Sequence, residues 1–134
     1  MVVSRSELLP IRGESEVVMV RQLVRAWCVE LKFGLVDQTK MVTAASELAR
    51  NTLTHGGGGT VDLQVVEDGD RRGLKLIFED KGAGIPDIDL AMKDGYTTGN
   101  GMGLGLGGSK RLVHEFEISS TVGQGTRVSI LRWK

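Results

Sequence analysis

The 134-residue sequence predicts one α+β domain, a two-layer α/β sandwich with helices on one face of a mixed, mostly antiparallel sheet. Three observations predict this fold class. Helical and strand-like hydrophobic spacings follow each other in the order β-α-α-β-β-(α)-α-β-β. Short turns join neighbouring strands, which favours antiparallel pairing. No repeat or linker divides the chain, so residues 1–134 are expected to form one domain.

The first half of the chain predicts a strand and two helices. Residues 3–12 mix polar and apolar side chains as a first strand does, and residues 14–33 follow a helical spacing. The apolar positions of this helix are Val17, Val20, Val24, Trp27 and Leu31. The second helix is expected to begin at Asp37, whose carboxylate can cap free backbone N–H groups, and to end near His55.

The second half of the chain predicts four strands and two more helices. Apolar alternation and glycine-containing turns separate these elements. The strands are expected at 60–67, 74–78, 116–120 and 126–133, and the helices at 87–93 and 104–115. The strand at 74–78 has the most continuous apolar run, so we expect it near the centre of the sheet.

The composition excludes several classes of protein. Seventeen basic and 17 acidic residues give a net charge of zero, which disfavours nucleic-acid binding. The single cysteine, Cys28, excludes an internal disulfide and a cysteine-built zinc site, and it is expected to be a core thiol. No apolar run reaches the about 18 residues of a membrane span, and the first residues lack a signal-peptide core. We therefore expect a cytoplasmic protein with neither nucleic acid nor membrane as a partner.

Glycine is the most informative residue type. There are 19 glycines, and 12 of them lie in three short stretches, at 56–59, 82–84 and 99–108. Flexible linkers are also rich in glycine, but strongly periodic elements do not border them as they do here. The three stretches are therefore candidate binding loops.

Two polar side chains share one face of the second predicted helix. Glu47 and Asn51 are four residues apart, which places them one above the other. A carboxylate and an amide oxygen suit either Mg²⁺ or the proton of a hydroxyl group. The alternative for this pair alone is an ordinary solvated helix face.

A carboxylate follows the apolar strand at 74–78. In the run Asp80-Lys81-Gly82-Ala83-Gly84, the carboxylate can accept hydrogen bonds from an exocyclic amine. The two glycines allow the backbone to pass close to a flat ring. The alternative is a tight turn with a polar tip.

A glycine-rich run opens the helix expected at 104–115. Free N–H groups and glycines at 101–108 can form a phosphate site. The run contains a G-x-G-x-x-G pattern, but a polar loop precedes it, so we reject a dinucleotide-binding fold. A P-loop is excluded because Ser109 separates the last glycine from Lys110. A flexible hinge is the alternative.

Four ordered patterns together carry more information than each alone. They are Glu47-x-x-x-Asn51, Asp80-x-Gly82-x-Gly84, Gly101-x-Gly103-Leu104-Gly105-Leu106 and Gly123-x-Gly125-Thr126. The patterns resemble the N, G1, G2 and G3 boxes of the GHKL ATPase/kinase superfamily, whose members have the Bergerat ATP-binding fold. Within that superfamily the chain resembles the small bacterial serine/threonine kinases that regulate sigma factors, most of all the stressosome switch kinases of the RsbT type.

The resemblance implies a role for each matched position. Asn51 would hold Mg²⁺ against the ATP phosphates, and Glu47 would be the general base toward the substrate hydroxyl. Asp80 would bind the adenine amine, Gly84 would pack under the ring, and Thr126 would support Asp80 through a polar contact. The remaining implied ATP contacts, several of them in a lid at 95–105, are Gly82, Thr97, Thr98, Gly101, Gly103, Leu104, Gly105, Leu106 and Lys110.

The resemblance also implies partners. Known members phosphorylate a STAS-domain antagonist protein and then switch to a PP2C-type phosphatase or another downstream regulator. Thr54-His55-Gly56 looks more like the anti-sigma-factor branch, so the alternative is an anti-sigma factor that sequesters a sigma factor and phosphorylates its anti-anti-sigma factor. A nucleotide-binding scaffold without transfer is a third hypothesis, which Glu47 argues against. His114 is expected to complement a helix dipole rather than to catalyse.

Overall fold

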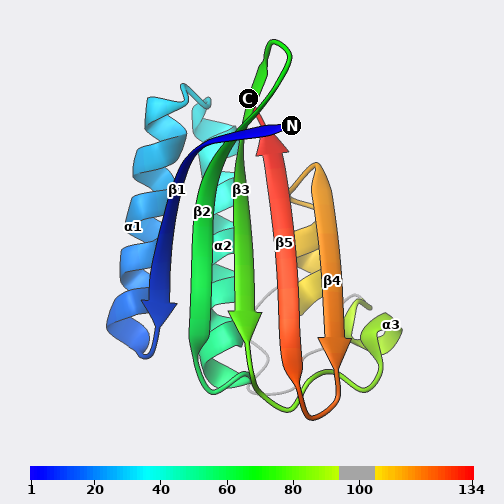
Figure 1. The fold of residues 1–134 in the computed structure, drawn as a ribbon. Coiled ribbons are helices and arrows are strands. Elements are labelled where there is room, and N and C mark those ends of the chain that lie inside the picture. The colour runs from blue at the N-terminus through cyan, green and yellow to red at the C-terminus, as the bar shows by residue number, and fades with distance from the viewer. Residues whose placement is uncertain (94–104) are drawn as a thin grey trace.

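The computed structural model of the protein describes residues 1–93 and 105–134, whose elements follow the predicted order (Figure 1). The strands are β1 (Val2–Ile11), β2 (Gly59–Asp68), β3 (Arg71–Asp80), β4 (Glu115–Thr121) and β5 (Gly125–Trp133). The helices are α1 (Glu14–Glu30), α2 (Leu35–Thr54), α3 (Ile88–Ala91) and α4 (Gly105–Lys110).

The sheet has five strands in the order β1-β2-β3-β5-β4. Every neighbouring pair is antiparallel, so the expectation of a partly mixed sheet was wrong. The strand at the centre is β3, which confirms the interpretation of its apolar run. The long helices α1 and α2 pack side by side behind the sheet, which gives the predicted two-layer α+β sandwich (Figure 1).

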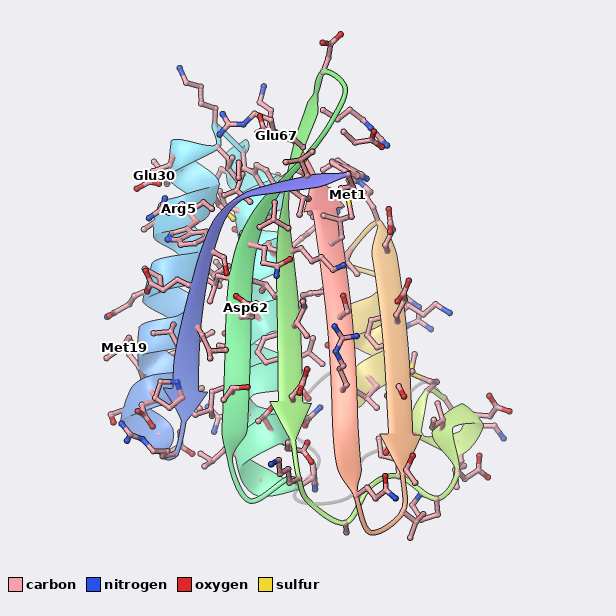
Figure 2. All side chains as sticks on the ribbon, viewed as in Figure 1. Met1, Arg5, Met19, Glu30, Asp62 and Glu67 are labelled. Atoms are coloured by element: carbon pink, nitrogen blue, oxygen red, sulfur yellow. The ribbon has the colours of Figure 1, made fainter. Side chains whose placement is uncertain are left out.

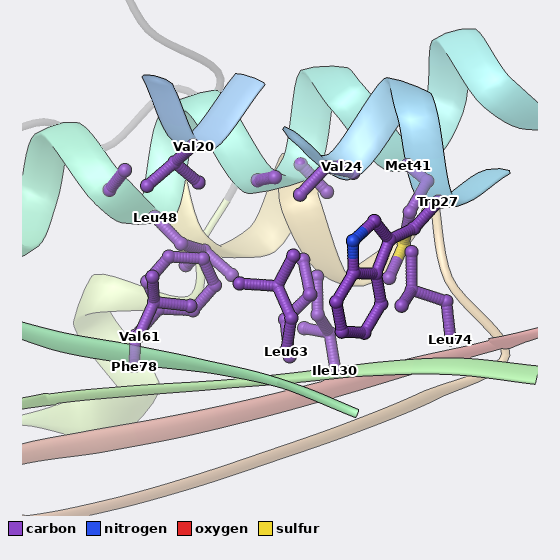
Figure 3. Close-up of a cluster of buried hydrophobic side chains, with 14 of the residues drawn as sticks. Val20, Val24, Trp27, Met41, Leu48, Val61, Leu63, Leu74, Phe78 and Ile130 are labelled. Atoms are coloured by element: carbon purple, nitrogen blue, oxygen red, sulfur yellow. The ribbon is translucent and has the colours of Figure 1, made fainter. Parts of the chain in front are cut away.

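The core lies between these two layers (Figure 3). Its largest fully buried side chains include Trp27 of α1, Leu48 of α2 and Phe78 of β3, each at most 2% exposed. Burying a large apolar side chain stabilises a fold by roughly 1.5–3 kcal/mol, so this helix–sheet contact fixes α2 against β3. Cys28 is fully buried, as expected, and this burial raises the pKa of its thiol to about 12.

The sheet face away from the helices is more polar. Asp62 of β2 lies on it (Figure 2) and accepts hydrogen bonds from Ser6 Oγ and from Gln64 Nε2, both 3.0 Å long. At one corner, the guanidinium of Arg5 lies over the ring of Trp27, 3.9 Å from its centroid, and pairs with Glu30. The β-bulge between Val3 and Arg5 lets Arg5 reach the helix side of the sheet.

Several helix boundaries differ from the prediction. The helix predicted at 14–33 ends at Glu30, and the one predicted at 87–93 spans only Ile88–Ala91. The second helix begins at Leu35 with Gly34 as its N-cap, so Asp37 caps nothing. Its carboxylate pairs instead with Arg132 of β5, at 2.5 Å. The helix predicted at 104–115 ends already at Lys110.

The early end of α4 has a physical cause. The N–H of His114 donates to the carbonyl of Leu131, so the chain has joined β5 before residue 115. His114 therefore does not sit at a helix end, and the dipole interpretation was wrong. Its Nδ1 accepts the N–H of Trp133 at 2.8 Å, and desolvation lowers its pKa.

One end of the sheet collects the loops that carry the predicted site. The ends of α2, β3 and β4 and the starts of β2 and β5 meet there, at the lower end in Figure 1. Both chain termini lie at the opposite end of the sheet (Figure 1). In the part of the chain that the structure describes, no helix is long and apolar enough to cross a membrane.

Candidate active site

The last turns of α2 carry Glu47 and Asn51 on one face, as their spacing predicted. Both side chains are partly buried. Oε1 of Glu47 accepts a hydrogen bond of 3.1 Å from the backbone N–H of Gly105, the first residue of α4. This contact joins two positions 58 residues apart. It places the candidate base beside the start of the glycine-rich helix.

The backbone carbonyl of Asn51 accepts the hydrogen bonds that follow the last turn of α2. Its carbonyl accepts the N–H groups of His55 at 2.9 Å and Gly56 at 3.3 Å. Within the described ranges 1–93 and 105–134, its side-chain amide makes no hydrogen bond to another residue.

Asn51 is the residue for which the sequence predicts a magnesium contact. Among the described residues there is no cluster of three or more His, Cys, Asp or Glu side chains that could hold a metal ion. Mg²⁺ usually keeps several waters and is bound by one or two carboxylates together with substrate phosphates. The amide oxygen of Asn51, one turn from Glu47, is a hard oxygen donor that could add to such a site.

Asp80 is the last residue of β3, and backbone atoms of neighbouring segments lie close to it. Its Oδ1 accepts the N–H of Gly82 at 2.9 Å. A side-chain carbon added at Gly56 would lie 2.3 Å from Cγ of Asp80, and one added at Gly125 would lie 2.1 Å from its carbonyl oxygen. A side chain fits at neither position, because it would collide with the carboxyl group of Asp80 at Gly56 and with the backbone of Asp80 at Gly125.

The loop that follows Asp80, residues 81–85, is predicted to contact adenine and is called the adenine loop below. Its glycines also pack against the protein itself. A side-chain carbon at Gly82 would lie 2.7 Å from Cα of Gly56. Gly84 has a φ of 79°, and a side-chain carbon there would lie 2.4 Å from the carbonyl oxygen of Thr121. Close backbone packing is therefore a sufficient reason for both glycines, whatever they contribute to a bound ring.

Thr126 lies opposite Asp80 in the β3–β5 ladder. Its hydroxyl is 2.7 Å from Oγ of Ser120, and within the described residues it makes no direct hydrogen bond to the Asp80 carboxylate. Ser120, which sequence reasoning missed, also accepts the N–H of Ile85 at 2.8 Å. No sequence signal singles it out, because a serine in a polar edge strand is ordinary.

The remaining predicted contacts divide between α4 and residues that the structure leaves undescribed. Leu106 is 8% exposed and belongs to the core, whereas Lys110 is exposed at the end of α4. Gly105 has a φ of 70°, which favours glycine where the helix starts. The predicted contacts that lie outside the described residues are Thr97, Thr98, Gly101, Gly103 and Leu104.

Comparison with known proteins identifies the family. Residues 36–134 match the model of the histidine kinase-, DNA gyrase B-, and HSP90-like ATPases. The chain is 46% identical to the serine/threonine-protein kinase RsbT of Bacillus subtilis over 123 residues, which cover 92% of each protein. It is 32% identical to the anti-sigma F factor of Clostridium kluyveri, over 81% of this chain and 79% of that protein.

Solved structures of other proteins have the same fold. The RsbU and RsbW domains of a Mycobacterium tuberculosis protein superpose with a TM-score of 0.63 at 20% identity, over 96% of this chain and 32% of that one. A mycobacterial sensor histidine kinase, MprB, gives a TM-score of 0.57 at 18% identity, over 96% of this chain and 97% of that one. The chain therefore belongs to the histidine kinase-, DNA gyrase B- and HSP90-like ATPase family, which implies that it binds ATP, and within that family it is an RsbT-like serine/threonine kinase.

Proposed function

We propose that this kinase transfers the γ-phosphoryl group of ATP, with Mg²⁺, to a serine or threonine of a STAS-domain antagonist protein. The observation that carries the proposal is the contact between Glu47 and the backbone N–H of Gly105. It brings the carboxylate of the predicted base to the start of the glycine-rich helix, where the resemblance places the ATP phosphates.

Asp80 is proposed to select the base of the nucleotide. Its Oδ1 is held by Gly82, and its second oxygen can accept a hydrogen bond from the exocyclic amine of adenine. Guanine presents an oxygen at the same place, so acceptor would face acceptor. The site therefore favours ATP over GTP.

Glu47 and Asn51 are proposed to act at the phosphate end of the nucleotide. The amide oxygen of Asn51 would bind Mg²⁺, which neutralises phosphate charge. The carboxylate of Glu47 would accept the proton of the substrate hydroxyl while the oxygen of that hydroxyl bonds to the γ-phosphorus. The bond between that phosphorus and the bridging oxygen breaks, and ADP leaves with the electron pair.

The proposal includes a change of partner after transfer. The kinase would leave its phosphorylated antagonist and activate a PP2C-type phosphatase or another downstream regulator. The 46% identity to a kinase of the RsbT type, against 32% to an anti-sigma F factor, favours this over sequestration of a sigma factor. The anti-sigma function is the second candidate, because relatives of that kind match most of the chain.

Glu47→Gln tests the chemical step. The variant keeps an acceptor oxygen for the N–H of Gly105 but cannot take a proton, so transfer to a purified STAS-domain protein of the same organism should fall by about 10²–10⁴-fold. ATP affinity should change little. Labelled ATP measures the transfer, and Glu30→Gln, at the far end of α1, is the matched control.

Two results would decide against the proposal. Transfer that survives within a few-fold in Glu47→Gln would remove Glu47 from the reaction. Capture of a purified sigma factor by the wild-type protein, whether or not it also labels the STAS-domain protein, would support the anti-sigma function instead.

A further inference from the structure

We propose that Ser120 is the positioning residue of the adenine loop, because its hydroxyl ties that loop to the turn between β4 and β5. The inference rests on the proposed role of Asp80 in binding adenine. Ser120 matches none of the four sequence patterns, and it contacts neither Glu47 nor Asn51 among the described residues.

Three contacts fasten the loop at 83–85 to the turn at 120–126. The N–H of Ile85 donates to Oγ of Ser120 at 2.8 Å, and the N–H of Gly123 donates to the carbonyl of Ala83 at 2.8 Å. Between these two bonds, Gly84 packs so closely on the carbonyl of Thr121 that no side chain fits. The loop that follows Asp80 is therefore shaped from one side by the turn.

The Ser120 hydroxyl uses its full hydrogen-bonding capacity. A serine hydroxyl offers one donor and two acceptor sites. The hydroxyl donates to the carbonyl of Gly125 at 3.1 Å and accepts the N–H of Ile85, and it lies 2.7 Å from the hydroxyl of Thr126, where either oxygen can donate. Ser120 thus joins the loop after Asp80 to the two residues of β5 that pack on and pair with Asp80.

Loss of this hydroxyl should change the binding of the adenine end of the nucleotide and leave the binding of its phosphates unchanged. Without Ser120 Oγ, the partly buried N–H of Ile85 has no partner, and such a group is costly to leave unsatisfied. The loop would then relax away from the turn and change the space beside Asp80. The residues proposed at the phosphates, Glu47 and Asn51, lie on α2 and keep their contacts.

Ser120→Ala should therefore weaken adenine recognition selectively. We expect the Kd of Mg-ATP, measured by calorimetry, to rise by about tenfold, while the Kd of Mg-tripolyphosphate stays within about twofold. KM for ATP should rise with little change in kcat. Ser120→Thr, which keeps the hydroxyl, should restore the affinity for ATP. Ser119→Ala, on the neighbouring exposed position of β4, is the control.

The result separates this inference from the function on which it rests. Equal losses for both ligands, or unchanged affinity for ATP in a folded variant, would overturn the role of Ser120. If the wild-type protein binds ATP no more tightly than tripolyphosphate, the proposed adenine site at Asp80 is contradicted instead. If Ser120→Ala does not fold, Ser120→Cys replaces it, because a thiol keeps the shape but is a weak acceptor.

Discussion

At the scale of the residue, the space around the Asp80 carboxyl group is set by residues that have no side chain. Gly56 belongs to none of the four sequence patterns, yet its backbone lies directly on the carboxyl group of Asp80. Its φ lies outside the left-handed region, so alanine would be tolerated by the backbone itself. The steric conflict with Asp80 is therefore the reason that glycine is required there.

Gly56→Ala should disturb nucleotide binding through Asp80. The added methyl carbon, 2.3 Å from Cγ of Asp80, must displace the carboxylate. Loss of a hydrogen bond to a charged group should raise the Kd of ATP by roughly tenfold or more. Calorimetry measures this, with Gly34→Ala as the control, because a side chain there meets nothing within 4 Å. An unchanged Kd in the folded variant would mean that Asp80 does not contact the nucleotide.

The sequence predicted which residues share one face of a helix, but not which residues far apart in the chain contact each other. The spacing of Glu47 and Asn51 is enough to place both on one helix face, and Asp80 lies at the strand end where it was predicted. The bond between Ser120 and Ile85 spans 35 residues, and no periodicity encodes it. The ligand roles of these side chains stay predictions.

At the scale of the element, α2 is fastened to the sheet by more than apolar packing. Arg132 of β5 is 11% exposed and pairs with Asp37 at 2.5 Å, and it also donates to the carbonyl of Leu112 at 2.9 Å. One side chain therefore ties the first turn of α2 and the segment after α4 to β5. The hydrogen bond from Arg132 lowers the pKa of Asp37 below its ordinary value of 3.8.

The Asp37–Arg132 pair should stabilise the protein at neutral pH and not in acid. Because the pKa of Asp37 is lower in the folded state, the contribution is complete above pH 3.8 and is lost as the pH falls through the folded value. Asp37→Asn should therefore lower Tm at pH 7, and the difference from wild type should shrink toward pH 3.

Thermal unfolding followed by circular dichroism measures this difference. Asp68→Asn is the control, because Asp68 and its partner Arg71 are both more than half exposed and such pairs contribute little. A Tm difference for Asp37→Asn that stays constant from pH 7 to pH 3 would contradict the ion-pair explanation.

Helix boundaries were less predictable than the helices themselves. Asp37 is a good N-cap residue by type, but the helix begins two residues earlier, at Leu35, and Asp37 bonds to Arg132 instead. The last helix was predicted too long because the segment after Lys110 is apolar enough to continue it. The pairing of His114 with Leu131 ends it, and only the assembled sheet determines that contact.

At the scale of the whole molecule, one end of the sandwich collects the candidate site and the other holds both termini (Figure 1). Hydrophobic periodicity predicted the two layers, because each layer buries one apolar face. It could not predict that β5 lies between β3 and β4, since strand order depends on pairing between distant segments. That order is what brings Thr126 beside Asp80 at the site.

A comparison of the affinities for ATP and GTP tests whether Asp80 binds adenine. If Asp80 accepts from the adenine amine, GTP leaves two acceptors unpaired, which costs about 1–3 kcal/mol, so ATP should bind at least about tenfold more tightly. Asp80→Asn should reduce that preference, because its amide can donate to the guanine oxygen. Calorimetric titration of both nucleotides into both proteins measures it. Equal wild-type affinities for ATP and GTP, or an undiminished ATP preference in Asp80→Asn, would contradict an adenine site at Asp80.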